Sequence, residues 1–405
     1  MISVEEAKRI LMERVRPVSA EEIPLNEALG RYLAQDIVSA YPHPLFDCSA
    51  IDGYAFRFDH DVTEWRVVGE VAAGDTFTGP LTKGECARIF TGGMVPADAD
   101  TCVMQEFVQR EGDRMRYSDG RLKAGSNVRL KGEQVKPGDV LLRKGERIDA
   151  VAIGFLASAG IQQVRCARAI ETMVITTGSE FAEASVVIDL VGGEGQASAP
   201  APGRIFNSNG AMLGAALTNS GVNNTMATSP DDMAALKWQF HWAWNAMRDV
   251  VILTGGVSVG DHDLVELAAQ EMGATIHFHG VAQKPGKPML FAELDGNFIF
   301  GLPGNPRAAL ILFWEYVLPF LRAMQGAKEP WTSSDHLPLA HAVQLKGDRA
   351  EFRAASVKGG KVTLLADEGS HMLKSLVSAD ALAYLPAEQR TWDAGEPVEV
   401  HYLPR

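Results

Sequence analysis

Alternating apolar and polar stretches in the second half of the chain predict strands that alternate with helices. Residues 249–253 (Asp-Val-Val-Ile-Leu) are mostly apolar and β-branched and end at glycines, which is typical of a short buried parallel strand. A helical pattern follows over 263–272, so this unit is a strand, a glycine loop and a helix. The neighbouring predicted elements are strands at 169–176, 222–226 and 275–279, a hairpin around Asp295-Gly296, and helices at 209–219, after Ser229 as N-cap, and from Pro306 to about Met324. The alternation predicts a doubly wound α/β domain.

The rest of the chain has different patterns. Residues 1–44 predict a helix and then extended chain, and 132–170 predict turns and a helix at 149–159 that packs on the N-terminal helix. Short strands with Gly, Asp and Thr between them are predicted at 65–71, 85–90, 101–107 and 114–117, and again at 337–345, 352–357, 362–365, 381–385 and 397–402. We therefore predict a multidomain protein of mixed α/β and β class. Its domains are a discontinuous N-terminal domain (1–44 with 132–170), a β-rich inserted domain (45–131), a central doubly wound α/β domain (171–327) and a C-terminal small β-barrel domain (328–405).

Three glycine-rich turns lie in the central region, at 254–260, 284–288 and 301–306. The first follows a strand and precedes a helix, which directs backbone N–H groups at one point where glycines let an anion approach. The second carries Lys284 and Lys287 on a turn that Pro285 and Gly286 keep out of a helix. Because α/β folds bind ligands at the carboxyl ends of their strands, the three turns together predict a pocket for a phosphorylated ligand.

Each turn alone has a plainer interpretation. The first would be an ordinary connection between a strand and a helix, and the lysine turn would be a solvated surface loop. The third would stop a strand and start a helix, with Pro306 at its first position. The segment 191–203 is rich in Gly, Ala and Pro and is predicted to be a mobile loop.

The composition of the chain excludes some classes of binding partner. With 405 residues, 46% hydrophobic and 22% charged, the chain is long enough for two to four globular domains. The formal net charge of −13 argues against nucleic acid as a partner, so a bound anion needs concentrated local donors. No stretch approaches the ~18–20 apolar residues of a membrane helix, and the acidic amphipathic N-terminus is unlike a signal peptide. Four cysteines without a pairing pattern (Cys48, Cys86, Cys102 and Cys166) predict reduced, buried thiols in a cytoplasmic protein.

Seven motifs, in order along the chain, resemble one family. They are 47–55 (Asp-Cys-Ser-Ala-Ile-Asp-Gly-Tyr-Ala), 91–96 (Thr-Gly-Gly-Met-Val-Pro), 132–133 (Gly-Glu), 177–180 (Thr-Gly-Ser-Glu), and the three turns at 255–260, 284–288 and 301–306. This set resembles the MoeA family, the molybdopterin molybdenumtransferases, which include the gephyrin E domain. The resemblance implies four domains, a central domain like the molybdopterin adenylyltransferases, and an elongated homodimer with a shared active site. It also implies possible contact with the adenylyltransferase and with cofactor-accepting enzymes.

The reaction implied by the resemblance is insertion of molybdate into adenylylated molybdopterin with release of AMP, assisted by Mg2+. Asp52, with Thr91 close by, would orient the oxyanion, the magnesium ion or an attacking water. Glu180 and Asp263 would hold the cation or contact substrate, so the predicted metal ligands are Asp52, Glu180 and Asp263. The predicted substrate-binding residues are Gly255, Gly256, Ser258, Gly260, Lys284, Lys287, Pro303, Asn305, Arg349, Ser370, His371 and Ser375. From the residues alone, Asp52 before Gly53 is equally an ordinary turn.

The chain departs from the family pattern at several positions. Gln134, Ser179 and Asn207 stand where acidic residues are usual, Ala308 replaces a frequent Ser, and Arg353 falls one place early. The loss of three carboxylates would weaken cation binding or accompany a non-catalytic role, so a pterin-binding carrier or scaffold stays open as a hypothesis. A molybdopterin adenylyltransferase also stays open, because the central domain alone would resemble that class. The choice between molybdate and tungstate also stays open.

Overall fold

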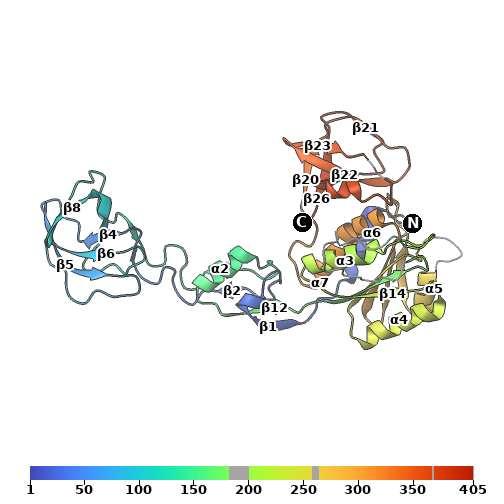
Figure 1. The fold of residues 1–405 in the computed structure, drawn as a ribbon, viewed down its shortest axis with the longest axis horizontal. Helices are drawn as coiled ribbons and strands as arrows, with labels where there is room; N and C mark the ends of the chain where they lie inside the picture. Colours follow the sequence, from blue (N-terminus) through green and yellow to red (C-terminus); the bar gives the residue numbers. More distant parts are fainter. Residues whose placement is uncertain (182–199, 258–263, 367–368, 405) are drawn as a thin grey trace.

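The computed structural model describes residues 1–181, 200–257, 264–366 and 369–404. The molecule is elongated (Figure 1). A β-rich distal unit (residues 50–127) lies at one end, and an arm of two antiparallel segments (20–49 and 128–167) joins it to a central α/β unit (169–325) and a terminal β unit (330–404). The mixed multidomain class predicted from the sequence is confirmed, whereas the predicted domain boundaries stay predictions.

The distal unit is one six-stranded sheet of order β7-β4-β6-β5-β9-β8. Its elements are β4 (Gly53–Phe56), β5 (Trp65–Val71), β6 (Glu85–Ile89), β7 (Thr101–Met104), the 3₁₀ turn η2 (Gln105–Phe107), β8 (Val108–Glu111) and β9 (Arg114–Tyr117). The predicted strand at 101–107 stops at Met104 because the 3₁₀ turn redirects the chain there. Trp65 is buried against the rings of Phe56 and Tyr117, with centroids 4.7 and 5.2 Å from its own, and these rings belong to one of the two apolar clusters of this small unit.

The arm consists of short antiparallel pairs between segments that are distant in sequence. The pairs are β1 (Ala20–Pro24) with β12 (Gln163–Ala167), β2 (Ile37–Val38) with β11 (Val140–Leu142), and β3 (Cys48–Ser49) with β10 (Val128–Arg129). The helix α2 (Ala150–Ser158) and the 3₁₀ turn η1 (Leu25–Glu27) pack on each other beside these strands. One segment of the arm therefore leads to the distal unit, and the other returns beside it to the central unit.

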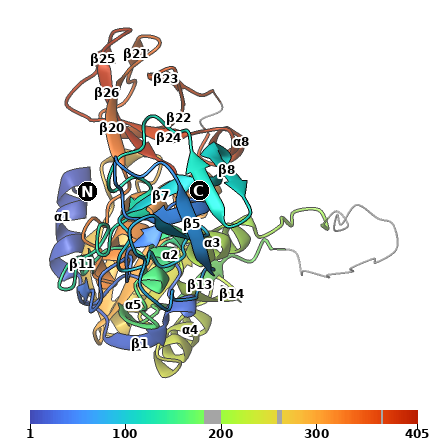
Figure 2. The same ribbon diagram turned by 90° about the vertical axis from the view of Figure 1, so that its left-hand side faces the viewer.

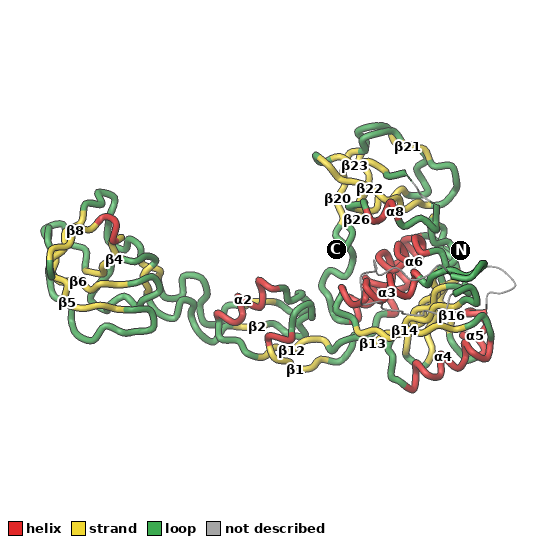
Figure 3. The backbone as a smooth tube through the Cα atoms, in the orientation of Figure 1, coloured by secondary structure: helices red, strands yellow, loops and turns green. Residues whose placement is uncertain are grey.

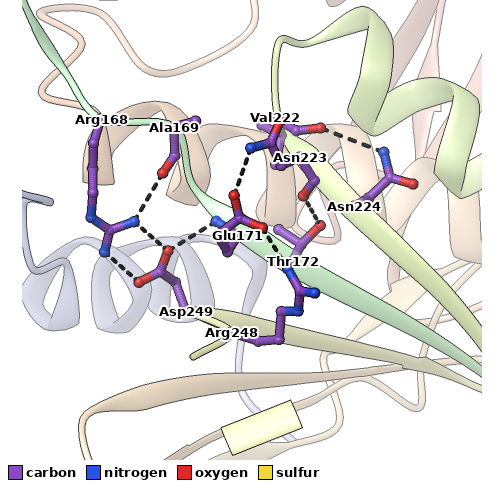
Figure 4. A network of polar contacts seen from close by, with 9 residues as sticks. All are labelled: Arg168, Ala169, Glu171, Thr172, Val222, Asn223, Asn224, Arg248 and Asp249. Carbon is purple, nitrogen blue, oxygen red and sulfur yellow. Dashed lines mark hydrogen bonds and ion pairs between the residues drawn. The ribbon is translucent and has the colours of Figure 1, made fainter. Parts of the chain in front are cut away.

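A network of charged side chains lies where the arm joins the central unit (Figure 4). Both terminal nitrogens of Arg168 donate to the carboxylate of Asp249, at 2.7 and 2.6 Å. The same carboxylate accepts from the backbone N–H of Glu171 at 2.9 Å, and Glu171 in turn accepts from Arg248 and from Asn223. Charge-assisted, bidentate bonds of this kind fix orientation as well as adding stability. We call this network the arm root.

Six strands form the central sheet, in the order β14-β13-β15-β19-β18-β16. They are β13 (Glu171–Thr177), β14 (Asn223–Ser229), β15 (Val250–Thr254), β16 (Thr275–His279), β18 (Leu290–Leu294) and β19 (Asn297–Leu302). Neighbours among β14, β13, β15 and β19 are parallel, which confirms the buried parallel strand predicted at 249–253. The hairpin at Asp295-Gly296 reverses the chain, so β18 pairs antiparallel with both β19 and β16 and the sheet is mixed.

Helices cover both faces of this sheet (Figure 3). One face carries α3 (Ser208–Asn219), α6 (Pro306–Leu312), the π turn η3 (Phe313–Val317) and α7 (Leu318–Met324), and the other carries α4 (Met233–Asn245) and α5 (Leu264–Glu271). Alternate strand residues serve the two cores: Val174 and Ile252 pack under α3 and α6, whereas Met173 packs under α4. The doubly wound prediction is confirmed. The predicted N-cap Ser229 is wrong, because β14 extends to that residue and Asp232 caps α4 instead.

The terminal unit is built from short strands. They are β20 (Ser334–Pro338), β21 (Val343–Gln344), β22 (Ala350–Lys358), β23 (Lys361–Leu364), β24 (Ala381–Leu385), β25 (Thr391–Trp392) and β26 (Pro397–Tyr402), with the short helix α8 (Lys374–Val377). The main sheet has the order β17-β22-β24-β26-β20, and β17 (Gln283–Lys284) comes from the central unit. This strand joins the predicted lysine turn to the terminal unit.

The N-terminal helix α1 (Val4–Arg14) packs on the central unit (Figure 2). Ser3 caps it by accepting from the backbone N–H of Glu6, and its apolar side, with Leu11 fully buried, contacts α7. The prediction that the helix at 149–159 packs on this helix is wrong: α2 belongs to a separate core in the arm. The buried residues Val4, Ala7 and Leu11 of α1 instead belong to the main core that includes α7.

The four cysteines are free and buried, as predicted. Burial raises the pKa of Cys86 to about 12 and that of Cys102 to about 11. Among the described residues, no helix combines the length and the apolar character that crossing a membrane requires.

Candidate active site

The first and third predicted turns meet at the carboxyl edge of the central sheet. The parallel register aligns Thr176 with Thr254 and Thr254 with Leu302, so β13, β15 and β19 end together. Gly255 has φ +94°, and a Cβ there would lie 2.6 Å from the backbone oxygen of Thr177. A Cβ built on Gly304 would lie 3.7 Å from the Cα of Gly255. The two turns therefore touch, and only glycine fits at 255.

Glu180 lies at the same edge, just beyond the end of β13. Gly178 has φ +147°, and a Cβ there would lie 2.2 Å from Oε2 of Glu180, so the carboxylate folds back over the backbone of this turn. Its side chain is exposed. Ser258, Gly260 and Asp263, which the sequence placed in this site, lie outside the described residues, as does most of the predicted loop 191–203.

Asn209 links the two turns and was not predicted from the sequence. It is 5% exposed, and its Nδ2 donates to Thr254 Oγ1 at 2.5 Å and to the backbone oxygen of Gly304 at 2.8 Å. Within the described part of the chain its Oδ1 has no hydrogen-bond partner. A buried amide oxygen without a partner is unfavourable, so this atom is placed to accept from a ligand. The sequence showed only that Asn209 begins a predicted helix, and its position beside the turns comes from the fold.

The third turn also contacts the terminal unit. Asn305 is the N-cap residue of α6, yet its exposed side chain makes no capping bond, and Pro303 is buried. Arg307, 1% exposed, contacts Ser375 Oγ through its guanidinium, and its backbone N–H donates to the oxygen of Ser370 at 3.2 Å. The predicted residues Ser370 and Ser375, with His371 exposed between them, are therefore next to this turn.

The lysine turn forms a second group. Lys284 is 53% exposed, and its Nζ lies 3.4 Å from Glu351 Oε1 on β22. Arg349 donates from Nη1 to the backbone oxygen of Gln283 at 3.1 Å, and the side chain of Lys287 is exposed. Two lysines and one arginine therefore concentrate positive charge here, with one carboxylate opposing it.

The two groups flank α6. A Cβ on Gly286 would lie 2.8 Å from the side chain of Leu312, at the carboxyl end of this helix, whereas Asn305 precedes its amino end. Seven residues of helix at 1.5 Å each separate the groups by about 10 Å. That span suits an extended ligand that reaches from one group to the other, and not a single small anion.

Asp52 and Thr91 lie together in the distal unit. Gly53 pairs with Ile89 across β4 and β6, which brings the residues beyond these ends side by side. Oδ1 of Asp52 accepts from both the backbone N–H and the hydroxyl of Thr91, each at 2.8 Å. The pKa of Asp52 is held below its usual range, mainly by the bond from the backbone N–H of Thr91, then by the bond from its hydroxyl, and least by the nearby charge of Arg88. A Cβ on Gly53 would lie 1.8 Å from the oxygen of Val103, so close strand packing requires this glycine.

Arg88 is a further functional candidate beside Asp52. Its guanidinium lies between the rings of Tyr54 and Phe90, 5.0 and 4.9 Å from their centroids. Nη1 donates to the backbone oxygen of Gly53 at 3.1 Å. The sequence showed a charged residue near the end of a strand, but its stacking depends on tertiary contacts.

The sites predicted from the sequence do not all meet within one chain. Asp52 lies in the distal unit, at the opposite end of the molecule from the strand-end turns (Figure 1). In the described residues no three His, Cys, Asp or Glu side chains form a group able to hold a metal ion. The predicted ligands Asp52 and Glu180 therefore form no common site in a single chain.

Three family models match consecutive parts of the chain. They are the MoeA N-terminal region (domain I and II) at residues 2–160, the "Probable molybdopterin binding domain" at 173–323 and the MoeA C-terminal region (domain IV) at 336–403. A molybdopterin molybdenumtransferase of Haemophilus influenzae is 31% identical over 411 residues, covering 99% of this chain and 98% of that protein. The chain belongs to the MoeA family. Its resemblance to that family is thereby confirmed.

Other similar proteins match nearly the whole of this chain. A molybdopterin molybdenumtransferase of a Nostoc species is 31% identical, covering 100% of this chain and 94% of that one. The molybdopterin biosynthesis protein moeA of Pyrococcus horikoshii, a solved structure, has a TM-score of 0.79 and 28% identity over 100% of both chains. Gephyrin of Dictyostelium discoideum is 29% identical, and the match covers 98% of this chain and 62% of that protein.

Proposed function

We propose that this MoeA-family chain is a molybdopterin molybdenumtransferase, which inserts molybdate into adenylylated molybdopterin and releases AMP. The observation that carries the proposal is the pair of touching glycine turns at the carboxyl edge of the central sheet, bridged by Asn209. Relatives that match nearly the full length of the chain are named for this activity.

The central turns and the lysine turn would each bind a different part of the substrate. The backbone N–H of Gly255 is already used, since it donates to the oxygen of Leu302 at 3.0 Å, so Gly255 contributes the close approach that its missing Cβ allows. The backbone N–H of Gly256 and the free amide oxygen of Asn209 suit the polar parts of the ligand. Lys284 and Lys287, with Arg349, would offset the charge of its pyrophosphate, and each charge-assisted bond is worth about 1.5–3 kcal/mol. Ser258, Gly260, Pro303, Asn305, Ser370, His371 and Ser375 complete the proposed binding set.

Asp52 and Thr91 act from a second copy of the chain in this proposal. Within one chain they are a whole arm away from the turns, so a shared site in a homodimer is the arrangement that unites them (Figure 1). The low pKa of Asp52 keeps it ionised, and a carboxylate that already accepts two bonds from Thr91 is held in one orientation. It would orient molybdate or an attacking water at the dithiolene.

Magnesium is part of the proposal. Carboxylates and phosphate oxygens are the ligands Mg2+ prefers, and the exposed carboxylate of Glu180 lies at the edge of the proposed pocket, so the donor chemistry fits. Glu180, Asp263 and Asp52 of the second copy would hold the ion, which neutralises charge on the leaving phosphate when bound.

The direct test supplies purified protein with adenylylated molybdopterin, Mg2+ and molybdate. Release of AMP with formation of active cofactor is expected. In a parallel assay with molybdopterin, ATP and Mg2+, ATP consumption with pterin adenylylation and release of pyrophosphate supports an adenylyltransferase instead. Binding without turnover in both assays supports a carrier. Replacing molybdate by tungstate in the same assay decides between the two oxyanions.

A mixing experiment tests the shared site. At substrate concentrations well below KM, Asp52→Asn and Lys284→Ala homodimers are each expected to keep at most about 10% of the normal activity. After unfolding, mixing in equal amounts and refolding, half of the dimers are mixed, and each of these has one intact site. We therefore expect about 25% of the normal activity. No recovery, with mixed dimers demonstrated by affinity tags, would place both residues in one chain's own site.

A further inference from the structure

Gln283, the first residue of β17, directly precedes the lysine turn and is fully buried. Its Nε2 donates to the backbone oxygen of Pro285 at 2.8 Å, and its Oε1 accepts from the hydroxyl of Tyr316. Its backbone oxygen accepts from Arg349 at 3.1 Å. One residue thus ties the turn to the long helix of the central unit and to the start of β22 in the terminal unit.

Tyr316 is placed by the π turn in this helix. The wider turn Phe313–Val317 directs two consecutive polar side chains inward, since Tyr316 is fully buried and Glu315 contacts His401. Around Tyr316 lie apolar residues of the main core, including Phe352 of the terminal unit. A buried amide and hydroxyl are unfavourable in such surroundings unless each polar atom is paired, and here Oε1 and Nε2 of Gln283 both are. An apolar pair would fill this space without that constraint, so the polar pair is better explained by what it holds in place.

The remaining contacts of the turn show what is held. Gly286 has φ +93°, and no larger residue fits there because Leu312 lies against it. The backbone oxygen of Lys287 accepts from Val281 N–H at 2.9 Å. The backbone of the turn is therefore bound to the core on its inner side, while the ammonium groups of Lys284 and Lys287 extend outward.

We propose that Gln283 and Tyr316 are positioning residues for the anion site. They do not touch substrate; they set the place of Lys284, Lys287 and Arg349 by fixing the carbonyl of Pro285 and the backbone of Gln283. This inference rests on the proposed function, because it takes the lysine turn to bind the phosphates of the substrate.

The first test compares two tyrosine hydroxyls. Tyr316→Phe removes one hydroxyl and leaves the amide oxygen of Gln283 buried without its donor. Tyr384→Phe is the matched control, because its hydroxyl contacts Glu5 and has no contact with the lysine turn. With inorganic pyrophosphate as the probe in calorimetric titration, we expect Tyr316→Phe to bind about three- to tenfold more weakly than wild type and the control to bind normally. In turnover, the KM for adenylylated molybdopterin should rise more than kcat falls.

The second test uses the conservative variant Gln283→Glu. An ionised carboxylate at position 283 repels the carbonyl oxygen of Pro285. A neutral carboxylic acid at this position can donate a hydrogen bond to that oxygen and still accept one from the hydroxyl of Tyr316. The charged groups beside the turn are Lys284 and Arg349, with Glu351 on β22. Those on the side of Tyr316 are Glu315 on the helix with its partner His401, Lys8, whose ammonium lies 5.9 Å from the Tyr316 ring, and Glu5, which contacts the hydroxyl of Tyr384. We expect the pyrophosphate affinity of this variant, divided by that of wild type at the same pH, to recover as the pH falls from 8 to 5.5. A purely structural role predicts a constant ratio.

The outcomes separate the inference from the proposed function. Lys284→Ala should weaken pyrophosphate binding about tenfold. If it does, but Tyr316→Phe matches the Tyr384→Phe control and the Gln283→Glu ratio does not change with pH, the positioning role is wrong and the anion site stands. If Lys284→Ala binds pyrophosphate normally, the proposed anion site is wrong and the positioning role with it. Should Tyr316→Phe not fold, the pH series on Gln283→Glu decides alone.

Discussion

Replacing Arg168 by Met tests the arm root. The change keeps most of the aliphatic stem and removes the guanidinium, so the Asp249 carboxylate keeps the backbone N–H of Glu171 but loses both charged donors. Removing one partner of a fully buried pair costs about 3–5 kcal/mol, whereas an exposed pair is worth about 0.2–1 kcal/mol. The side chains of Arg168 and Asp249 are 35% and 15% exposed, which places this pair between the two cases. We expect a loss of about 2 kcal/mol, which lowers the melting temperature by about 4–8 °C for a unit of this size.

The assay is thermal unfolding followed by tryptophan fluorescence, since α4 of the central unit carries three tryptophans. Arg16→Met is the matched control: its partner Glu293 is equally shielded, but Arg16 is 58% exposed, so its loss should cost under about 1 kcal/mol. The arm root lies at the amino ends of β13 and β15, opposite the turns, so pyrophosphate affinity should stay normal while turnover falls. Equal melting temperatures for the two variants would refute the reasoning.

Three further predictions concern single residues. Gly255→Ala should destabilise the central unit by about 2–4 kcal/mol and weaken binding of adenylylated molybdopterin, because a Cβ there meets backbone at 2.6 Å, whereas Gly304→Ala, with its nearest atom at 3.7 Å, should cost under about 1 kcal/mol. Burial alone would lower the pKa of His401, but hydrogen bonds to two carboxylates raise it to about 9, so the stability it adds is complete below about pH 6.5 and is lost as the pH rises through 9. Urea unfolding should therefore show a loss of up to roughly 3 kcal/mol over this range, absent in His401→Gln. Thr91→Val should raise the pKa of Asp52 toward its usual value, measured by carbon NMR titration of the carboxyl group.

Each of these has an outcome that contradicts it. Equal effects of the two alanine substitutions would mean that the first turn relaxes around a side chain. The same pH profile in wild type and in the His401 variant would assign the alkaline loss to another group. An unchanged pKa of Asp52 would mean that the backbone N–H alone sets its charge.

The sequence predicted best those elements whose own residues determine them. The apolar, β-branched run at 249–253 becomes a parallel strand wherever it is buried, and glycines that follow such strands leave few alternatives to tight turns. The pairs that build the arm were missed, because strands of two residues such as β2 have no periodicity and pair with segments about a hundred residues away. The π turn was also missed, since a single wider turn leaves the helical pattern around it almost unchanged.

The candidate site divides in the same way. Asp52, Glu180 and the lysines were named because their neighbours form recognisable motifs. Asn209, Arg88 and Gln283 were not, because their importance arises from contacts with residues far along the chain. His279, whose ring bridges Glu266 and the carbonyl of Val257 beneath the first turn, belongs to this second group.

The contact between Arg168 and Asp249, which we call the pivot, sets the angle at which the arm leaves the central unit. A small rotation at the pivot displaces Asp52 much further than it displaces the pivot itself, because the distal unit lies at the far end (Figure 1). If Asp52 acts in the shared site proposed above, substitutions at Arg168 or Asp249 alone would change the catalytic rate while every residue of the site stays the same.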